Sequence, residues 1–151
     1  MTSPRHRARE FAVQGIYQWQ LTGHDTPEIE AHLMETAGFE KADYGLFTTL
    51  LRGTLKEALE LRTDIEPLLD RAFADLSPVE RAILFLAAFE FKRQLETPYR
   101  VVLNEAIELA KSFGGTDGHK YVNGVLDKLA ARLRATEVEH YAAQRRAARE
   151  G

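Results

Sequence analysis

The sequence predicts an all-α protein, a compact helical bundle of six or seven helices, and three observations support this. Apolar residues recur along most of the chain at the i, i+3, i+4 spacing that places them on one face of a helix. Prolines and small polar residues stand where helices would begin. No alternating β-branched run is bounded by a hairpin dipeptide, so no strand is indicated. We expect residues 1–151 to form a single helical domain, with 130–151 as a C-terminal extension.

The first half of the chain predicts four helices. Their expected ranges are 8–21, 26–38, 43–62 and a short segment from Asp64. Thr26-Pro27 marks the second start, because proline suits the first position of a helix, and Gly38 marks the end of that helix.

The clearest helix start lies in the middle of the chain, at Ser77-Pro78-Val79-Glu80. Ser77 can cap the free backbone N–H groups, and Glu80 stands where it completes a capping box. The residues that follow are apolar on nearly all sides through Phe89, which predicts a central buried helix.

Two more helices are expected after this one, from Pro98 and from about His119, joined by the tight connection Gly114–Gly118. Gly124 lies inside the last helix, where glycine is unfavourable, so we expect another segment to approach closely there. The tail from about residue 130 is weakly amphipathic, and it either continues the last helix or frays.

The composition is that of an ordinary soluble globular protein, with 44% hydrophobic and 28% charged residues. The absence of cysteine excludes disulfides and thiolate chemistry. No apolar segment follows the basic N-terminus, and the longest apolar run, Ala82–Phe89, is far shorter than the roughly 20 residues that span a bilayer. We therefore expect a cytoplasmic protein that does not enter a membrane.

Catalytic and metal-binding patterns are missing from the sequence. It contains no glycine-rich phosphate loop, no paired metal-ligand spacing and no nucleophile elbow, and its five histidines lie on separate segments. Glu105 and Glu108 could suggest acid–base chemistry, but on an otherwise apolar helix we interpret them as structural or partner-facing. We expect no enzyme activity, no cofactor and no metal.

Charge is unevenly distributed, although the net charge is only −3. Arginines gather near both ends of the chain: Arg5, Arg7 and Arg9 with His6, and Arg145, Arg146 and Arg149. Cations near a helix N-terminus oppose the helix dipole, so the first cluster is not explained by helix stability. With Gln14, Tyr17 and Trp19 on the same helix it is typical of a site for phosphates and unpaired bases. The alternative, a solvated basic terminus, stays open at this point.

A second candidate site is the turn into the last helix. A glycine-rich turn presents free backbone N–H groups to an anion, and Lys111, His119 and Lys120 add positive charge. Tyr121 could supply a stacking ring, and Asp117 a helix cap or a hydrogen-bond acceptor for RNA. The same turn is also an ordinary connection between helices, so alone it is weak support.

Several motifs together resemble the NusB family. The opening Arg5-His6-Arg7-Ala8-Arg9-Glu10-Phe11 is similar to the arginine-rich first helix of that family, and Pro78-Val79-Glu80-Arg81-Ala82-Ile83-Leu84 to its central helix. The C-terminal signature is similar over 98–111 and 119–127, including Tyr121-Val122-Asn123-Gly124. The resemblance is dense over about 5–20 and 77–130, whereas 23–76 agrees only in helical character.

The resemblance implies two packed three-helix subdomains and a transcription antitermination function. Such a protein would bind the single-stranded boxA element of ribosomal-RNA transcripts together with NusE, a small-subunit ribosomal protein, within an RNA polymerase antitermination complex. By position, the residues implied to face RNA are Arg5, His6, Arg7, Arg9, Gln14, Asp117, Lys120 and Tyr121. Tyr17 and Glu80 would face NusE. His6 stands where many relatives have arginine, which puts RNA affinity in question.

Three other interpretations bear on this one. A helical protein–protein adaptor would touch RNA only incidentally, and it would lack a steep salt dependence of RNA binding. The interpretation as a domain appended to an RNA-modifying enzyme fails, because the sequence contains no cofactor loop. A homodimer has no sequence marker and is left open.

Overall fold

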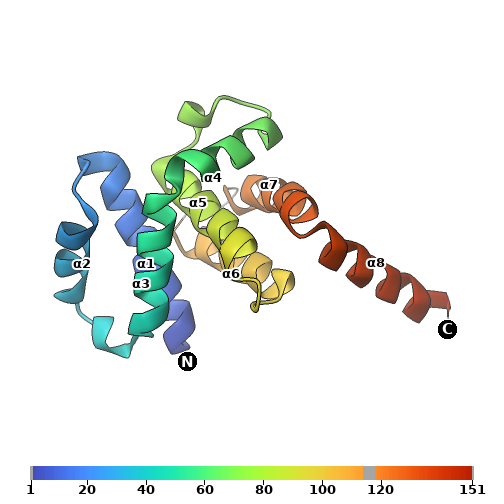
Figure 1. Cartoon of the computed structure of the whole chain (residues 1–151), viewed down its shortest axis with the longest axis horizontal. Helices are drawn as coiled ribbons and strands as arrows, with labels where there is room; N and C mark the ends of the chain where they lie inside the picture. Colours follow the sequence, from blue (N-terminus) through green and yellow to red (C-terminus); the bar gives the residue numbers. More distant parts are fainter. Residues whose placement is uncertain (1, 114–117, 151) are drawn as a thin grey trace.

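The computed structural model describes residues 2–113 and 118–150, and Figure 1 shows its helices. They are α1 (Pro4–Thr22), α2 (Thr26–Met34), α3 (Tyr44–Lys56), α4 (Ala58–Ile65), α5 (Pro78–Arg93), α6 (Tyr99–Phe113), α7 (Gly118–Leu133) and α8 (Ala135–Glu150). Three short 3-10 turns, η1 (Phe39–Lys41), η2 (Glu66–Leu68) and η3 (Phe73–Asp75), connect some of them. The described part of the chain contains no strand, which confirms the all-α prediction.

The helices form two groups of three. Helices α1, α2 and α3 pack against one another, and so do α5, α6 and α7 (Figure 1). Helix α5 joins the groups, because it also contacts α1, α3 and α4. The expected pair of three-helix subdomains is therefore present, with α4 and α8 added to it.

Helix α5 is central and buried, as its composition predicts. The Ser77 hydroxyl accepts a hydrogen bond from the Glu80 backbone N–H at 3.1 Å, and the Glu80 carboxylate accepts one from the Ser77 N–H at 3.0 Å. Behind this capping box, every residue from 82 to 91 is buried. Gly53 of α3 lets α5 approach, because a Cβ atom there would lie 2.2 Å from the Phe89 ring.

The helix expected over 43–62 is in fact two helices. The backbone of Glu57, at φ −101° and ψ 13°, leaves the α-helical region between α3 and α4. The change of direction packs Leu61 and Ile65 of α4 into the core beside α5. The expected helix start at Asp64 is also wrong, since Asp64 lies in the last turn of α4, which ends at Ile65 and is followed by η2.

Two expectations for the last part of the chain are corrected. A Cβ atom on Gly124 would meet nothing within 4 Å, so no segment of the described chain approaches closely there. The tail neither continues α7 nor frays at its start, because Arg134 separates α7 from the distinct helix α8. No helix in residues 2–113 and 118–150 is long and apolar enough to cross a membrane.

Candidate nucleic-acid interface

The N-terminus of α1 presents two arginines at the surface. The Ser3 hydroxyl caps the helix by accepting a hydrogen bond from the His6 N–H at 3.0 Å, and the first turn contains no acidic residue. The Arg5 side chain is 52% exposed, and its guanidinium lies a loose 3.8 Å from the Asp43 carboxylate. Arg7 is half-buried and forms no ion pair with any described residue. Both guanidinium groups can therefore offer hydrogen-bond donors to an anion.

Arg9, in contrast, lies inside the protein. Its side chain is 2% exposed, and its Nε and Nη2 atoms donate to the two Glu90 carboxylate oxygens at 3.0 and 2.9 Å. Burial opposes the charge, but the hydrogen bonds and charge of Glu90 outweigh it and raise the pKa of Arg9. The expectation that Arg9 contacts RNA directly is corrected, because an arginine paired in the core is out of reach of a ligand.

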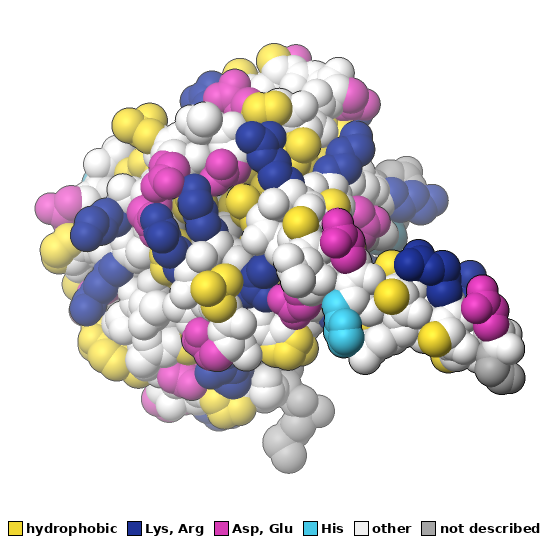
Figure 2. Space-filling model, turned by 45° about the vertical axis from the view of Figure 1, so that its right-hand side comes forward, with side chains coloured by type: hydrophobic (Ala, Val, Ile, Leu, Met, Phe, Trp, Pro, Cys, Tyr) yellow, Lys and Arg dark blue, Asp and Glu magenta, His cyan; other side chains and the backbone are white. Residues whose placement is uncertain are grey.

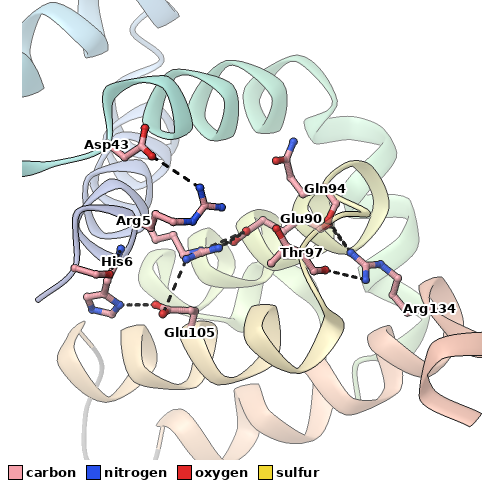
Figure 3. Close-up of polar contacts among 10 residues, drawn as sticks. Arg5, His6, Asp43, Glu90, Gln94, Thr97, Glu105 and Arg134 are labelled. Carbon is pink, nitrogen blue, oxygen red and sulfur yellow. Dashed lines mark hydrogen bonds and ion pairs between the residues drawn. The ribbon is translucent and has the colours of Figure 1, made fainter. Parts of the chain in front are cut away.

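His6 is turned towards α6 rather than outwards. Its Nδ1 atom lies 2.5 Å from the Glu105 carboxylate, which is also 4.0 Å from the Arg9 guanidinium (Figure 3). A continuous polar chain, Glu90–Arg9–Glu105–His6, thus fixes the start of α1 against α5 and α6. Sequence reasoning missed Glu90. A carboxylate directly after the apolar stretch 82–89 is the signal that could have revealed it, because a buried acid needs a buried base.

The turn into α7 gives a second group of candidate residues. Asp117 lies outside the described residues. Lys120 is exposed at the start of α7, and Tyr121 is half-buried, with the Arg71 guanidinium 4.0 Å from its ring centroid. Burial and the neighbouring Asp70 carboxylate raise the pKa of Tyr121. One face of the ring is therefore occupied, and a base that stacked on that face would have to displace Arg71.

The two predicted clusters have different neighbours in the fold. Arg5 and His6 contact the start of α3 and the middle of α6, whereas Tyr121 lies against the loop between η2 and η3. A ligand that touches both clusters must run across the surface between them.

Gln14 and Tyr17 belong to a third feature, a groove of about 800 Å³ along the middle and end of α1. Its lining is Val13, Gln14, Tyr17, Gln18, Leu21, Thr22, His24, Glu28, His32, Leu33, Val79 and Phe113. Tyr17 and Leu21 are exposed, at 38% and 56%. Exposed apolar side chains along a groove are typical of a surface that binds a partner protein.

Glu80 follows Val79, which lines this groove, but is not itself one of the lining residues. One carboxylate oxygen of Glu80 is engaged in the capping box at the start of α5. The other oxygen is free to accept a hydrogen bond from a partner. Of the two sequence-predicted partner residues, Tyr17 lines the groove, whereas Glu80 is only adjacent in sequence to the lining residue Val79.

The comparisons with known proteins agree on one family. The family model for "NusB family" matches residues 6–131. The transcription antitermination protein NusB of Aromatoleum aromaticum is 61% identical over 134 residues, covering 89% of this chain and 92% of its own length. That of Nitrosomonas europaea is 56% identical, covering 90% of this chain and 81% of its own length.

Solved structures extend the agreement to the fold. T. maritima NusB superimposes with a TM-score of 0.75 at 28% identity, covering 86% of this chain and 92% of its own. A chain from a crystal structure of the antitermination factors NusB and NusE in complex with double-stranded RNA has a TM-score of 0.73 at 25% identity, covering 85% and 97%. The family model matches most of this chain, and NusB proteins are more than half identical to it. This chain therefore belongs to the NusB family.

Proposed function

We propose that this protein is an RNA-binding transcription antitermination factor. It would bind the single-stranded boxA element of ribosomal-RNA transcripts together with NusE, within an RNA polymerase antitermination complex. The observation that carries the proposal is the pair Arg5 and Arg7, two accessible cations at a helix N-terminus, where cations reduce helix stability. Such a placement is accounted for by an anionic ligand. The naming of its relatives as antitermination proteins supports the same conclusion.

The RNA-facing residues in this proposal form two clusters: Arg5 and Arg7, and Asp117, Lys120 and Tyr121. Gln14, which the sequence also predicts to face RNA, lines the groove along α1 instead. Arginine suits phosphates through its planar fork of donors, and Tyr121 offers an aromatic ring to an unpaired base. His6 and Arg9 act by holding α1 in place, because Glu105 and Glu90 engage them.

The NusE-facing surface in this proposal is the groove that contains Tyr17 and Leu21, with Glu80 next in sequence to its lining residue Val79. An apolar centre with polar side chains around it is the usual composition of a protein interface. The protein would act by binding alone, without catalysis, and in the cytoplasm, where RNA is transcribed in bacteria. A homodimer through the same groove would compete with NusE.

Replacing Arg5 and Arg7 together with alanine is expected to weaken boxA RNA binding about tenfold at moderate salt. The plot of log affinity against log salt should become shallower by about 1.4, since each phosphate contact to a single strand contributes roughly 0.7. The check is a titration of short boxA RNA, with and without NusE, across a salt series. Arg62→Ala, which removes an exposed arginine paired with Glu66, is the control that should leave binding unchanged. Equal affinity of the double variant and the parent protein would remove the start of α1 from the RNA surface.

Replacing Leu21 with aspartate is expected to weaken NusE binding by about 10- to 100-fold, because it puts a charge into the apolar centre of the groove. Leu59→Asp is the matched control, because Leu59 is 86% exposed on α4, outside the groove. Calorimetric titration of each variant with NusE would compare them. If Leu21→Asp binds NusE as the parent does, the groove is not the NusE surface.

A further inference from the structure

Helix α8 projects from the bundle (Figure 1). Only its first half packs against the rest of the protein, through Val138 and Tyr141, and every residue from 143 to 150 is exposed. A short helix without a packing surface is marginally stable in water. The second half of α8 is therefore unusual in having no structural partner among the described residues.

The arginines of α8 differ from those of the bundle in their pairing. Bundle arginines mostly lie against a carboxylate, as in Arg5–Asp43, Arg9–Glu90, Arg52–Glu30, Arg62–Glu66, Arg71–Asp70 and Arg93–Glu57. Across the described residues, no carboxylate pairs with Arg100, Arg145, Arg146 or Arg149. Figure 2 shows basic side chains gathered on the projecting helix, beside hydrophobic ones. Three arginines without a carboxylate partner among the described residues thus lie within residues 145–149 of α8.

Tyr141 orders part of this cluster. The Arg100 guanidinium lies 4.2 Å from the ring centroid of Tyr141, and that of Arg145 lies 5.8 Å from it. The ring is held in turn by the edge of Tyr99, with 6.2 Å between the two centroids. Stacking on an aromatic face restrains a guanidinium while leaving its N–H donors free, whereas a carboxylate partner would occupy them. The donors therefore remain available to a ligand.

These side chains border a shallow groove of about 410 Å³ between the start of α6 and α8. Its lining is Tyr99, Val138, Tyr141, Ala142, Arg145, Arg146 and Arg149. The lining thus combines two aromatic rings with three arginines. This combination fits the sugar–phosphate backbone of a single-stranded nucleic acid, which offers phosphates to arginine and apolar sugar and base faces to aromatic rings.

We infer that the α8 groove is a second RNA contact, which binds the backbone of single-stranded RNA. All of its lining residues except Tyr99 follow residue 131, where the match to the family model ends. The inference rests on the proposed RNA-binding function and extends it. Contacts to phosphates carry no base specificity, so α8 adds affinity for RNA that continues beyond boxA without changing the sequence that is recognised.

The test compares two RNAs on the full chain: a short boxA RNA, and the same RNA extended by about a dozen uridines, enough for one single-strand site. The variant Arg145→Gln/Arg146→Gln/Arg149→Gln removes the groove's arginines. The control variant Arg52→Gln/Arg62→Gln/Arg93→Gln removes the same charge from exposed arginines that carboxylates already neutralise. Circular dichroism confirms that both variants are folded.

We expect the parent protein and the control variant to bind the extended RNA about tenfold tighter than the short one, with a salt slope steeper by about 2 for three added phosphate contacts. The α8 variant should bind both RNAs equally and match the parent on the short one. Tyr141→Phe should still bind the extended RNA more tightly than the short one, because the ring remains. In Tyr141→Leu the gain in affinity from the extension should be several-fold smaller.

Equal binding of the two RNAs by the parent protein would overturn the α8 inference, and so would an equal loss in the control variant. Poly-glutamate that displaced the uridine extension at lower concentration than free poly-uridine would also overturn it, and would assign the groove to an acidic protein segment. Failure of the parent to bind even the short RNA would instead overturn the proposed function, so the two failures are distinguishable.

Discussion

Replacing Arg9 with alanine is expected to lower the free energy of unfolding by about 3–5 kcal/mol, the usual cost of breaking a buried ion pair from one side. The Glu90 carboxylate would stay in the core without the two hydrogen bonds that Arg9 donates. Water cannot replace them there, because the Glu90 side chain is only 3% exposed. Urea unfolding followed by circular dichroism gives the free energy of unfolding. The m-value checks that the surface exposed on unfolding is unchanged.

A double-mutant cycle separates the energy of the Arg9–Glu90 interaction from the ordinary cost of lost packing. Glu90→Leu alone should cost a similar amount, because it leaves the Arg9 guanidinium buried with only Glu105 nearby. Arg9→Met combined with Glu90→Leu should recover most of the loss, since two apolar side chains can replace a buried pair at little cost. Arg5→Ala, in the exposed turn before it, should change stability by less than about 0.5 kcal/mol. A loss below about 1 kcal/mol in both single variants would show that the pair is solvated.

Replacing Arg134 with methionine is expected to lower the free energy of unfolding by about 3–5 kcal/mol. The carbonyl groups of Phe91 and Thr97 lose their donor, and those of Glu90 and Gln94 keep only a backbone N–H donor. The Arg134 guanidinium donates to four backbone oxygens: Glu90 at 3.2 Å, Phe91 at 2.6 Å, Gln94 at 2.9 Å and Thr97 at 3.1 Å. Figure 3 shows it at the turn that follows α5. Three of the four oxygens belong to the last turn and C-cap of α5, where a cation also complements the helix dipole.

Arg132→Met is the control for this prediction, because Arg132 is an exposed neighbour on α7. The stability of Arg134→Lys should lie between that of Arg134→Met and that of Arg132→Met. One ammonium group cannot reach all the carbonyl groups that are spread around the planar guanidinium. Thermal unfolding of the three variants ranks them. If Arg134→Met unfolds at the temperature of the Arg132 control, water must satisfy the carbonyls and the guanidinium is dispensable.

The sequence predicted those parts of the fold that local signals determine. Ser77 and Glu80 define a helix start by their own hydrogen bonds, so the start of α5 was placed correctly. The break at Glu57 was missed, because apolar residues keep the helical spacing on both sides of it. The break depends on how α4 reaches α5, and such a tertiary contact leaves no pattern in a single sequence. The prediction for Gly124 was wrong for a similar reason, because a glycine in the sequence does not indicate which segment, if any, lies beside it.

For the candidate interface, the sequence predicted the residue types more reliably than the directions in which the side chains point. Arg5, Arg7 and Arg9 looked equivalent in the sequence, yet Arg9 points into the core. Its position was readable in hindsight, since it lies three and seven residues before the buried Ala12 and Ile16, on the same side of the helix. Nothing in the sequence linked it to Glu90, 81 residues away, because long-range pairing is decided by packing.

The side chains that close the α5–α6 turn lie beyond the stretch that the family model matches. Arg134 holds the end of α5, and the Glu137 carboxylate accepts a hydrogen bond at 2.8 Å from the Tyr99 N–H at the start of α6, while the family model ends at residue 131. The end of the family-model match at residue 131 thus falls short of side chains that support the core. A stop codon just after residue 131 would therefore remove Arg134 and Glu137, and with them part of the core's own support.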